Sequence, residues 1–184
     1  MRTYILPFAE KNARILLMFM DEASFGRISE PSYCWCPTGV RPIVPCQKIR
    51  EYLYLFGAIN PITGEDYFII APKCNTEWTS EFLKAISKEF ENDYLLICTD
   101  NASWHKSKKL FVPDNIYLHF LPPYTPEMNP TEQIWIEIRN DGFKNTSFAT
   151  LNAVEDKLVH STNSLSPDIV KSISGRDWIL NMFN

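Results

Sequence analysis

The sequence lacks the long apolar segments that membrane proteins and secreted precursors carry. Its longest apolar run, residues 15–20, is far shorter than the roughly 20 residues of a membrane-spanning helix. Two acids, Asp21 and Glu22, follow that run directly, an arrangement that does not suit a signal peptide. Internal repeats and low-complexity segments are also missing. These absences predict a cytoplasmic protein with no membrane partner.

Cysteine and histidine are too few and too scattered to indicate a zinc site. The five cysteines are odd in number and show no repeated CxxC spacing, and the chain has only three histidines. The alternative, a metal ion held by Cys34 and Cys36, lacks a histidine nearby in the sequence. Reduced intracellular thiols are therefore the expected state.

Excess positive charge is missing as well. With 18 Lys and Arg against 22 Asp and Glu, the formal net charge is -4. This balance argues against a nucleic-acid binder that acts through bulk electrostatics, although local basic patches remain compatible with DNA. A chain of 184 residues, 45% of them hydrophobic, suits a single domain over residues 1–184 with a sizeable core.

The chain does contain an alternation of strand and helix patterns. Residues 15–20 and 94–98 are apolar on both faces, as buried strands are, while residues 23–46 are rich in Gly, Pro, Ser and Cys and predict mostly extended loop with short edge pairing. The order of elements predicts an α/β sheet of mixed direction. The expected elements are strands 15–20, 51–59 and 66–71, the latter two forming a hairpin, a helix 76–90, a strand 94–98, a short crossover helix within 103–111, a strand 116–120, and helices 130–140, 149–161, 168–173 and 177–182.

Three carboxylates from distant segments occupy positions where ligands gather in such sheets. Asp21 and Asp100 follow apolar strands, and Glu132 lies in the first turn of an expected helix. Two divalent ions about 4 Å apart can activate an attacking water and stabilise a leaving oxygen if hard oxygen ligands hold them. Because clustered carboxylates repel one another, such a group implies either bound metal or raised pKa values.

Each acid also has a purely structural interpretation. Asp21 and Asp100 could simply begin loops. Glu132 could complete a capping box, with Asn129 as the N-cap and Pro130 at the first helical position. Glu22 competes with Asp21, because adjacent residues of a strand face opposite sides.

Three strings in the chain carry a family resemblance. FMDEASFG at 19–26, TDNASWH at 99–105 and LPPYTPEMNPTEQIW at 121–135 resemble the three motifs of DDE-type transposases of the mariner superfamily, in its bacterial insertion-sequence branch. The similarity extends from about residue 15 to the C-terminus. Two departures are small: Thr125 stands where the family commonly has Ser, and Thr131 where it commonly has an aliphatic residue.

The resemblance implies a ribonuclease-H-like fold, a mixed five-stranded sheet flanked by helices, with a core over about 15–145 and C-terminal helices over 146–184. It implies that Asp21, Asp100 and Glu132 are catalytic and ligate two Mg²⁺ or Mn²⁺ ions. The implied activity is hydrolytic cleavage at transposon ends, followed by attack of the freed 3′ hydroxyl on target DNA at TA dinucleotides. A homodimer in a synaptic complex with DNA, associated with a prokaryotic nucleoid, is the implied setting.

Other residues of these motifs are candidates for supporting roles. Asn101 and His105 could orient water or a phosphate, and Asn129 could support Glu132; a loop histidine without function is the alternative for His105. Three lysines follow the second motif and either contact DNA phosphates or form a solvated basic face. These are Lys106, Lys108 and Lys109.

A helix-turn-helix module is not expected before the first motif, which begins within about twenty residues of Met1. We therefore expect the catalytic half of a transposase, encoded as a separate frame, joined by frameshifting or truncated, with a possible separately encoded DNA-binding half. Two alternatives remain: another ribonuclease-H-like nuclease of the repair or resolvase type, and an inactive remnant that binds DNA or a partner.

Overall fold

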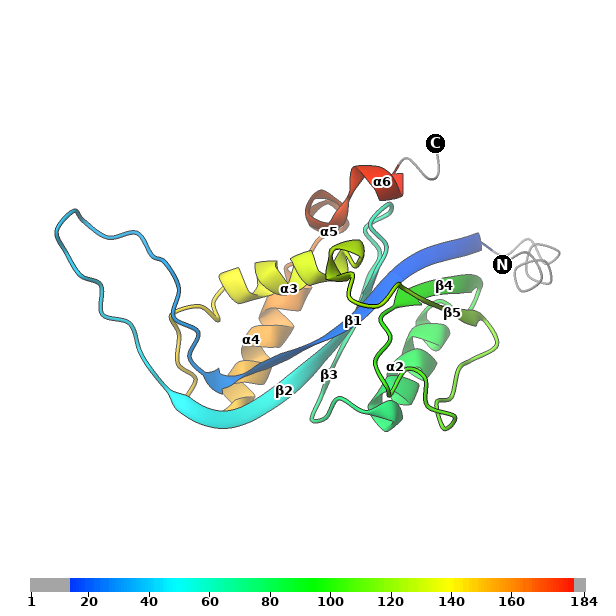
Figure 1. The fold of residues 1–184 in the computed structure, drawn as a ribbon, viewed down its shortest axis with the longest axis horizontal. Helices are drawn as coiled ribbons and strands as arrows, with labels where there is room; N and C mark the ends of the chain where they lie inside the picture. Colours follow the sequence, from blue (N-terminus) through cyan, green and yellow to red (C-terminus); the bar gives the residue numbers. More distant parts are fainter. Residues whose placement is uncertain (1–13, 181–184) are drawn as a thin grey trace.

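The structure is a computed structural model that describes residues 14–180. One mixed sheet with strand order β3-β2-β1-β4-β5 forms its centre (Figure 1). The central strand β1 pairs antiparallel with β2 and parallel with β4, which confirms the predicted mixed sheet. The strands are β1 (Arg14–Ile28), β2 (Lys48–Ile59), β3 (Asp66–Ala71), β4 (Asp93–Thr99) and β5 (Ile116–Phe120).

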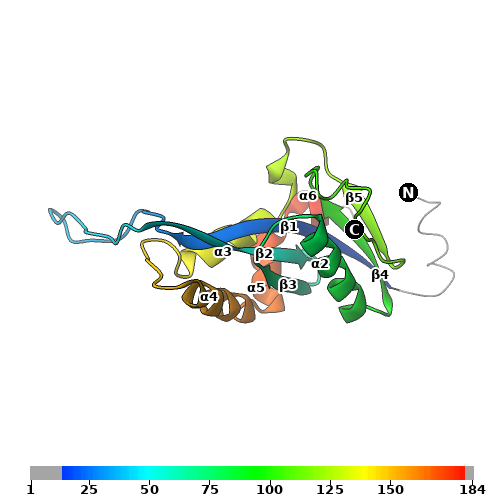
Figure 2. The same cartoon turned by 90° about the horizontal axis from the view of Figure 1, so that it is seen from below.

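Helices cover both faces of the sheet (Figure 2). Alternate residues of β1 face opposite sides, so that Met18 belongs to the apolar cluster under α2 and Phe19 to the cluster under α3, α4, α5 and α6. The helices are α2 (Thr76–Glu89), α3 (Thr131–Asn140), α4 (Leu151–Asn163), α5 (Pro167–Ser174) and α6 (Asp177–Leu180). All were predicted within a few residues; the last two residues predicted for the final helix lie outside the described residues.

Strand β1 is longer than the sequence predicted. Asp21 was expected at its end, and residues 23–46 as mostly loop, but β1 continues to Ile28 and pairs with β2 up to Lys48. Phe25 is buried in this extension, and Gly26 permits close pairing, because a Cβ there would lie 2.4 Å from Cδ1 of the Tyr52 ring. The segment 29–47 connects the two strands. Residues near its ends contact Lys144, Asn145 and Phe148, and its middle extends away from the rest of the molecule (Figure 1).

The helix predicted within residues 103–111 is wrong, because this crossover consists of turns. Its first part is held by side chains rather than by a helical ladder: Ala102 N–H donates to Asp100 Oδ1 at 3.0 Å, and His105 is buried. Such local side-chain bonds compete with helix formation. The contacts made just after the end of β4 therefore determine the conformation of the crossover.

Two further expectations concern membranes and thiols. Within residues 14–180, no helix combines the length and hydrophobicity that crossing a membrane requires. All five cysteines are free, and Cys98 alone among them is buried.

Candidate active site

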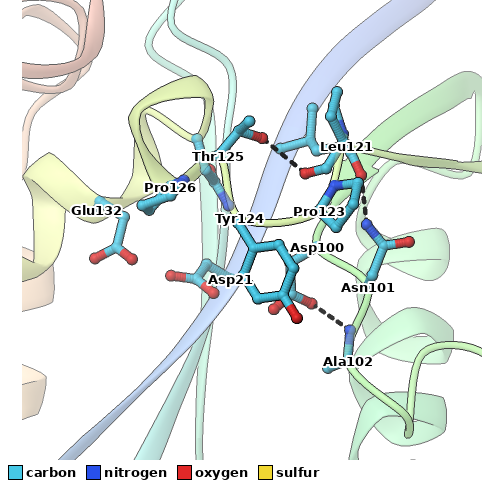
Figure 3. Close-up of a pocket in the computed structure, with 12 residues that line it drawn as sticks. Asp21, Asp100, Asn101, Ala102, Leu121, Pro123, Tyr124, Thr125, Pro126 and Glu132 are labelled. Atoms are coloured by element: carbon cyan, nitrogen blue, oxygen red, sulfur yellow. Dashed lines mark hydrogen bonds between the residues drawn. The ribbon is translucent and has the colours of Figure 1, made fainter.

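A pocket of about 420 Å³ lies where β1, the end of β4 and the start of α3 meet (Figure 3). The three acids singled out from the sequence, Asp21, Asp100 and Glu132, all line it. Asn101 and Asn129, two of the predicted supporting residues, line it as well. The fold thus brings together side chains that are separated by up to 111 positions in the chain.

Asp21 lies in the middle of β1, just beyond the last pair that β1 forms with β4. Its Oδ2 accepts a 2.8 Å hydrogen bond from the indole Nε1–H of Trp135, which is buried in α3. Burial raises the pKa of Asp21 to about 7; the Trp135 bond opposes this shift, and the negative charge of Glu132 adds to it. Near neutral pH the carboxyl group is therefore divided between its two protonation states.

Gly57 makes the Trp135 contact possible. It is the β2 residue paired with Asp21, and a Cβ there would lie 2.7 Å from Cη2 of Trp135. Only a residue without a side chain lets the indole lie this close to the strand. The bare backbone of β2 thus helps to place the donor that reaches Asp21.

The start of α3 is attached to β1 beside Asp21, and this attachment positions Glu132. Asn129 Nδ2 donates to Met20 O at 3.0 Å, and Thr131 Oγ1 donates to Phe19 O at 2.8 Å. Both side chains are buried, so these bonds are protected from water. Glu132 follows directly in the first turn and is thereby held on the Asp21 side of the pocket.

The predicted capping box is wrong in two respects. Pro130, not Asn129, precedes the first residue of α3, although Asn129 Oδ1 still accepts from Thr131 N–H at 3.2 Å. In addition, Asn129 N–H donates to Pro126 O at 2.9 Å rather than to Glu132. A capping role therefore does not occupy the Glu132 carboxylate.

Asp100 belongs to a chain of charged groups that continues into the protein. His105 Nδ1 lies 2.8 Å from Asp100 Oδ1, and His105 Nε2 lies 2.8 Å from Glu22 Oε1. Burial lowers the pKa of His105, but the bonds to Asp100 and Glu22 outweigh it and raise the pKa to about 9. At neutral pH the imidazolium donates to both carboxylates, and its bond to Asp100 lowers the pKa of that acid.

The remaining candidates have different surroundings. The side-chain amide of Asn101 donates to Leu121 O, and Leu121 N–H donates to Thr99 O at 2.8 Å, so Asn101 ties the two loops that border the pocket. Lys106 Nζ lies 5.4 Å from the centroid of the Phe120 ring, outside the acid pocket.

Lys109 lines a separate surface hollow beside α2, and Lys108 is exposed. Phosphate binding by these lysines, and water orientation by Asn101, stay predictions.

The donor chemistry of the pocket fits divalent cations. Carboxylate oxygens are the ligands that Mg²⁺ and Mn²⁺ prefer. A cation would also offset the burial and, to a smaller extent, the charge of Glu132 that raise the pKa of Asp21. Within residues 14–180, however, no three His, Cys, Asp or Glu side chains are already close enough to form a ready metal cluster. Ligation by Asp21, Asp100 and Glu132 therefore stays a prediction.

Sequence reasoning missed the roles of Trp135 and Glu22. Trp135 stands three residues after Glu132, which puts it on the same helical face. A buried indole N–H requires an acceptor, and that requirement was the available signal. Glu22 was considered only as a rival of Asp21, whereas it faces the other side of β1 and binds His105.

Comparisons with known proteins bear on the family of this chain. Residues 16–155 match the DDE superfamily endonuclease family. An uncharacterised protein of Sinorhizobium fredii, y4pE/y4sA, is 35% identical over 130 residues, which cover 69% of this chain and 96% of that protein.

Solved structures of Mos1 mariner transposase complexes share the ribonuclease-H-like fold. The pre-cleavage Mos1 transpososome has a TM-score of 0.67 at 11% identity, and the paired-end complex with the left transposon end has 0.65 at 12%. A Mos1 paired-end complex with Mn has 0.63 at 13%. Each match covers 94% of this chain but 55% of the Mos1 chain, so the chain spans about half the length of these relatives.

Proposed function

Because the chain belongs to the DDE superfamily endonucleases, we propose that it is the catalytic part of a transposase, which cleaves DNA at transposon ends and joins them to target DNA. The observation that carries this proposal is the single pocket that Asp21, Asp100 and Glu132 all line. Its walls come from three separate elements, so the acids converge through the fold and not through local sequence. Convergent carboxylates in a cleft are what metal-assisted phosphodiester chemistry requires.

In this proposal the three acids hold Mg²⁺ or Mn²⁺, as a two-metal site. Bound divalent cations would supply activation of the attacking oxygen and stabilisation of the leaving oxygen. Trp135 would hold Asp21 in one orientation, and His105 would do the same for Asp100. Asp21 and Asp100 would thus both be held in place before DNA binds, which lowers the entropic cost of assembling the site.

The proposed partners are transposon ends, target DNA and a second copy of the chain. Support comes from the Mos1 structures, which are paired-end and strand-transfer complexes. Recognition of the terminal repeats would fall to a DNA-binding part distinct from this catalytic part. This division of labour agrees with the net charge of -4.

The decisive experiment is strand transfer of a pre-cleaved transposon end with Mg²⁺ or Mn²⁺, comparing the chain with its Asp100→Asn variant. We expect the variant to lose more than about 100-fold in rate, since even indirect supports of metal ligands typically contribute 10–100-fold. Asp66→Asn is a matched control, because burial raises the pKa of Asp66 to about 6 but Asp66 lies outside the pocket.

Equal product from wild type and Asp100→Asn would contradict the catalytic assignment. Cleavage of branched DNA without strand transfer would instead favour a repair or resolvase nuclease. A folded wild-type chain that binds DNA and never cleaves it would indicate an inactive remnant.

A further inference from the structure

Tyr124 is an aromatic side chain without packing partners at the mouth of the acid pocket. Its relative exposure is 100%, although it lines the same pocket as Asp21 and Asp100. In Figure 3 its ring extends from the loop after β5 toward these two acids. Burial in the core of this chain therefore does not account for the ring.

The backbone holds Tyr124 in a conformation that residues with a Cβ rarely adopt. Its φ is +60°, in the left-handed region. Thr125 Oγ1 donates to Pro122 O at 2.7 Å and closes the turn around it. Pro123 directly before Tyr124 and Pro126 two positions after it remove further backbone freedom. Because the turn is so restricted, the ring stays at the pocket mouth.

The pocket presents two kinds of surface to a bound strand. Its floor carries carboxylates, which suit cations and, through them, a phosphate. Its rim carries the flat apolar ring of Tyr124, and such a ring face does not bind a charged phosphate group. The face of a nucleobase does bind such a ring, by stacking. Bases at strand ends or flipped out of a duplex are free to stack on aromatic side chains.

We propose that Tyr124 stacks on an unpaired nucleobase of the nucleotide that adjoins the phosphodiester held at Asp21, Asp100 and Glu132. This inference rests on the proposed function, since it requires DNA in the pocket. Stacking fixes the position of the strand on one side of the reacting phosphate, so Tyr124 acts as a positioning residue for the substrate. The contact tolerates any base, because every base has a π-face.

A thermodynamic cycle tests the proposal. The full chain and its Tyr124→Ala variant are assayed on DNA ends that carry a single abasic site at each of the nucleotides flanking the scissile phosphate. On intact DNA we expect Tyr124→Ala to weaken equilibrium binding roughly 5- to 150-fold, the range that corresponds to stacking of one base. At one abasic position that loss should disappear, because the ring has no base to contact.

Two variants isolate the contribution of the ring. Tyr124→Phe keeps the π-face and should bind within about twofold of wild type. Tyr33→Ala removes an equally exposed tyrosine from the segment 29–47, away from the pocket, and should show no coupling to any abasic position. Fluorescence of 2-aminopurine at the coupled position should be quenched by wild type and by Tyr124→Phe but not by Tyr124→Ala.

Equal losses for Tyr124→Ala on intact DNA and at every abasic position would overturn the inference, as would a Phe variant as weak as the Ala variant. Because binding and quenching need no turnover, they remain decisive if the chain neither cleaves nor transfers DNA. A wild type that performs strand transfer but shows no coupling would retain the proposed function and reject stacking by Tyr124.

Discussion

Asp21 and Asp100 line one pocket, yet their surroundings push their pKa values in opposite directions. Asp21 lies in the middle of the central strand, and burial raises its pKa to about 7. Asp100 lies in the loop after β4 with its side chain 56% exposed, and the bond to His105 lowers its pKa. At neutral pH Asp100 is therefore ionised, while Asp21 keeps its proton in part of the molecules and would have to lose it there before the carboxylate could hold a cation.

This difference indicates how the two sides of the pocket would contribute to the proposed metal site. The Asp100 side is electrostatically prepared, since a buried imidazolium holds the carboxylate in its charged form. The Asp21 side is geometrically prepared, because β1, Gly57 and Trp135 hold the carboxylate in place while burial opposes its charge. A cation at Asp21 would replace the missing solvation.

The largest expected effects come from removing either charge. Asp21→Asn and Asp100→Asn should each lower strand transfer by more than about 100-fold if both acids ligate metal. Their effects on stability in EDTA should differ in sign at pH 8. Asp21→Asn should stabilise the fold by roughly 2–4 kcal/mol, because it removes a buried charge whose pKa is shifted upward. Asp100→Asn should destabilise it, because His105 loses an ionised partner.

The sign for Asp21 follows from its two pKa values, 3.8 when unfolded and about 7 when folded. Well below pH 3.8 both states are protonated. As the pH rises toward 7 the unfolded state loses the proton first, so the folded state loses stability across this range. Urea unfolding at pH 4 and pH 8 measures the effect, and a stability gain of Asp21→Asn that does not grow between these pH values would contradict the burial of its charge.

A smaller effect is expected on the pH dependence of metal binding. With one proton displaced from Asp21, the affinity for Mn²⁺ should rise about tenfold per pH unit below pH 7 and level off above it. Trp135→Phe removes the donor that opposes the rise in pKa, so the plateau should move to higher pH. Isothermal titration calorimetry at several pH values measures both curves, and coincident curves would assign no electrostatic role to the indole N–H.

On the Asp100 side, Glu22→Gln should lower the pKa of His105 below about 9, because one of its two carboxylate partners loses its charge. We expect about a tenfold loss of metal affinity, which is typical for groups that orient a metal ligand. The chain has only three histidines, so NMR titration can follow His105 directly. Glu65→Gln is a suitable control, because Glu65 lies in the turn between β2 and β3 and pairs with Arg14, and it should leave that titration unchanged.

The smallest expected effects distinguish the two asparagines beside the acids. Asn129→Ala should cost about 1–3 kcal/mol of stability, because Met20 O loses its donor in a buried setting. Asn101→Ala should cost about 1 kcal/mol, since Asn101 is only partly buried. Thermal unfolding compares them, and a larger cost at Asn101 would mean that the loop side, not the strand side, is the more rigidly held.

Strands and helices were predictable from the sequence where a single hydrophobic pattern specified them. The apolar run 15–20 and the helical period of α2 depend on local spacing; the run forms the first half of β1, and α2 formed close to the expected residues. Predictions were wrong where contacts between residues distant in sequence determined the local structure instead. The outer half of β1 is a strand because β2 pairs with it, and the segment after Asp100 is not a helix because Glu22 and Asp100 hold His105 in the interior.

The sequence by itself determined the family, the order of elements and the three acids to examine, because motif residues and hydrophobic periods are local properties of the chain. Only the tertiary structure decided which groups surround each acid. Trp135 and Gly57 meet Asp21, and His105 joins Asp100 to Glu22, through contacts between separate elements. Since a pKa depends on burial and on neighbouring charges in space, the opposite shifts of Asp21 and Asp100 arise only once the chain is folded.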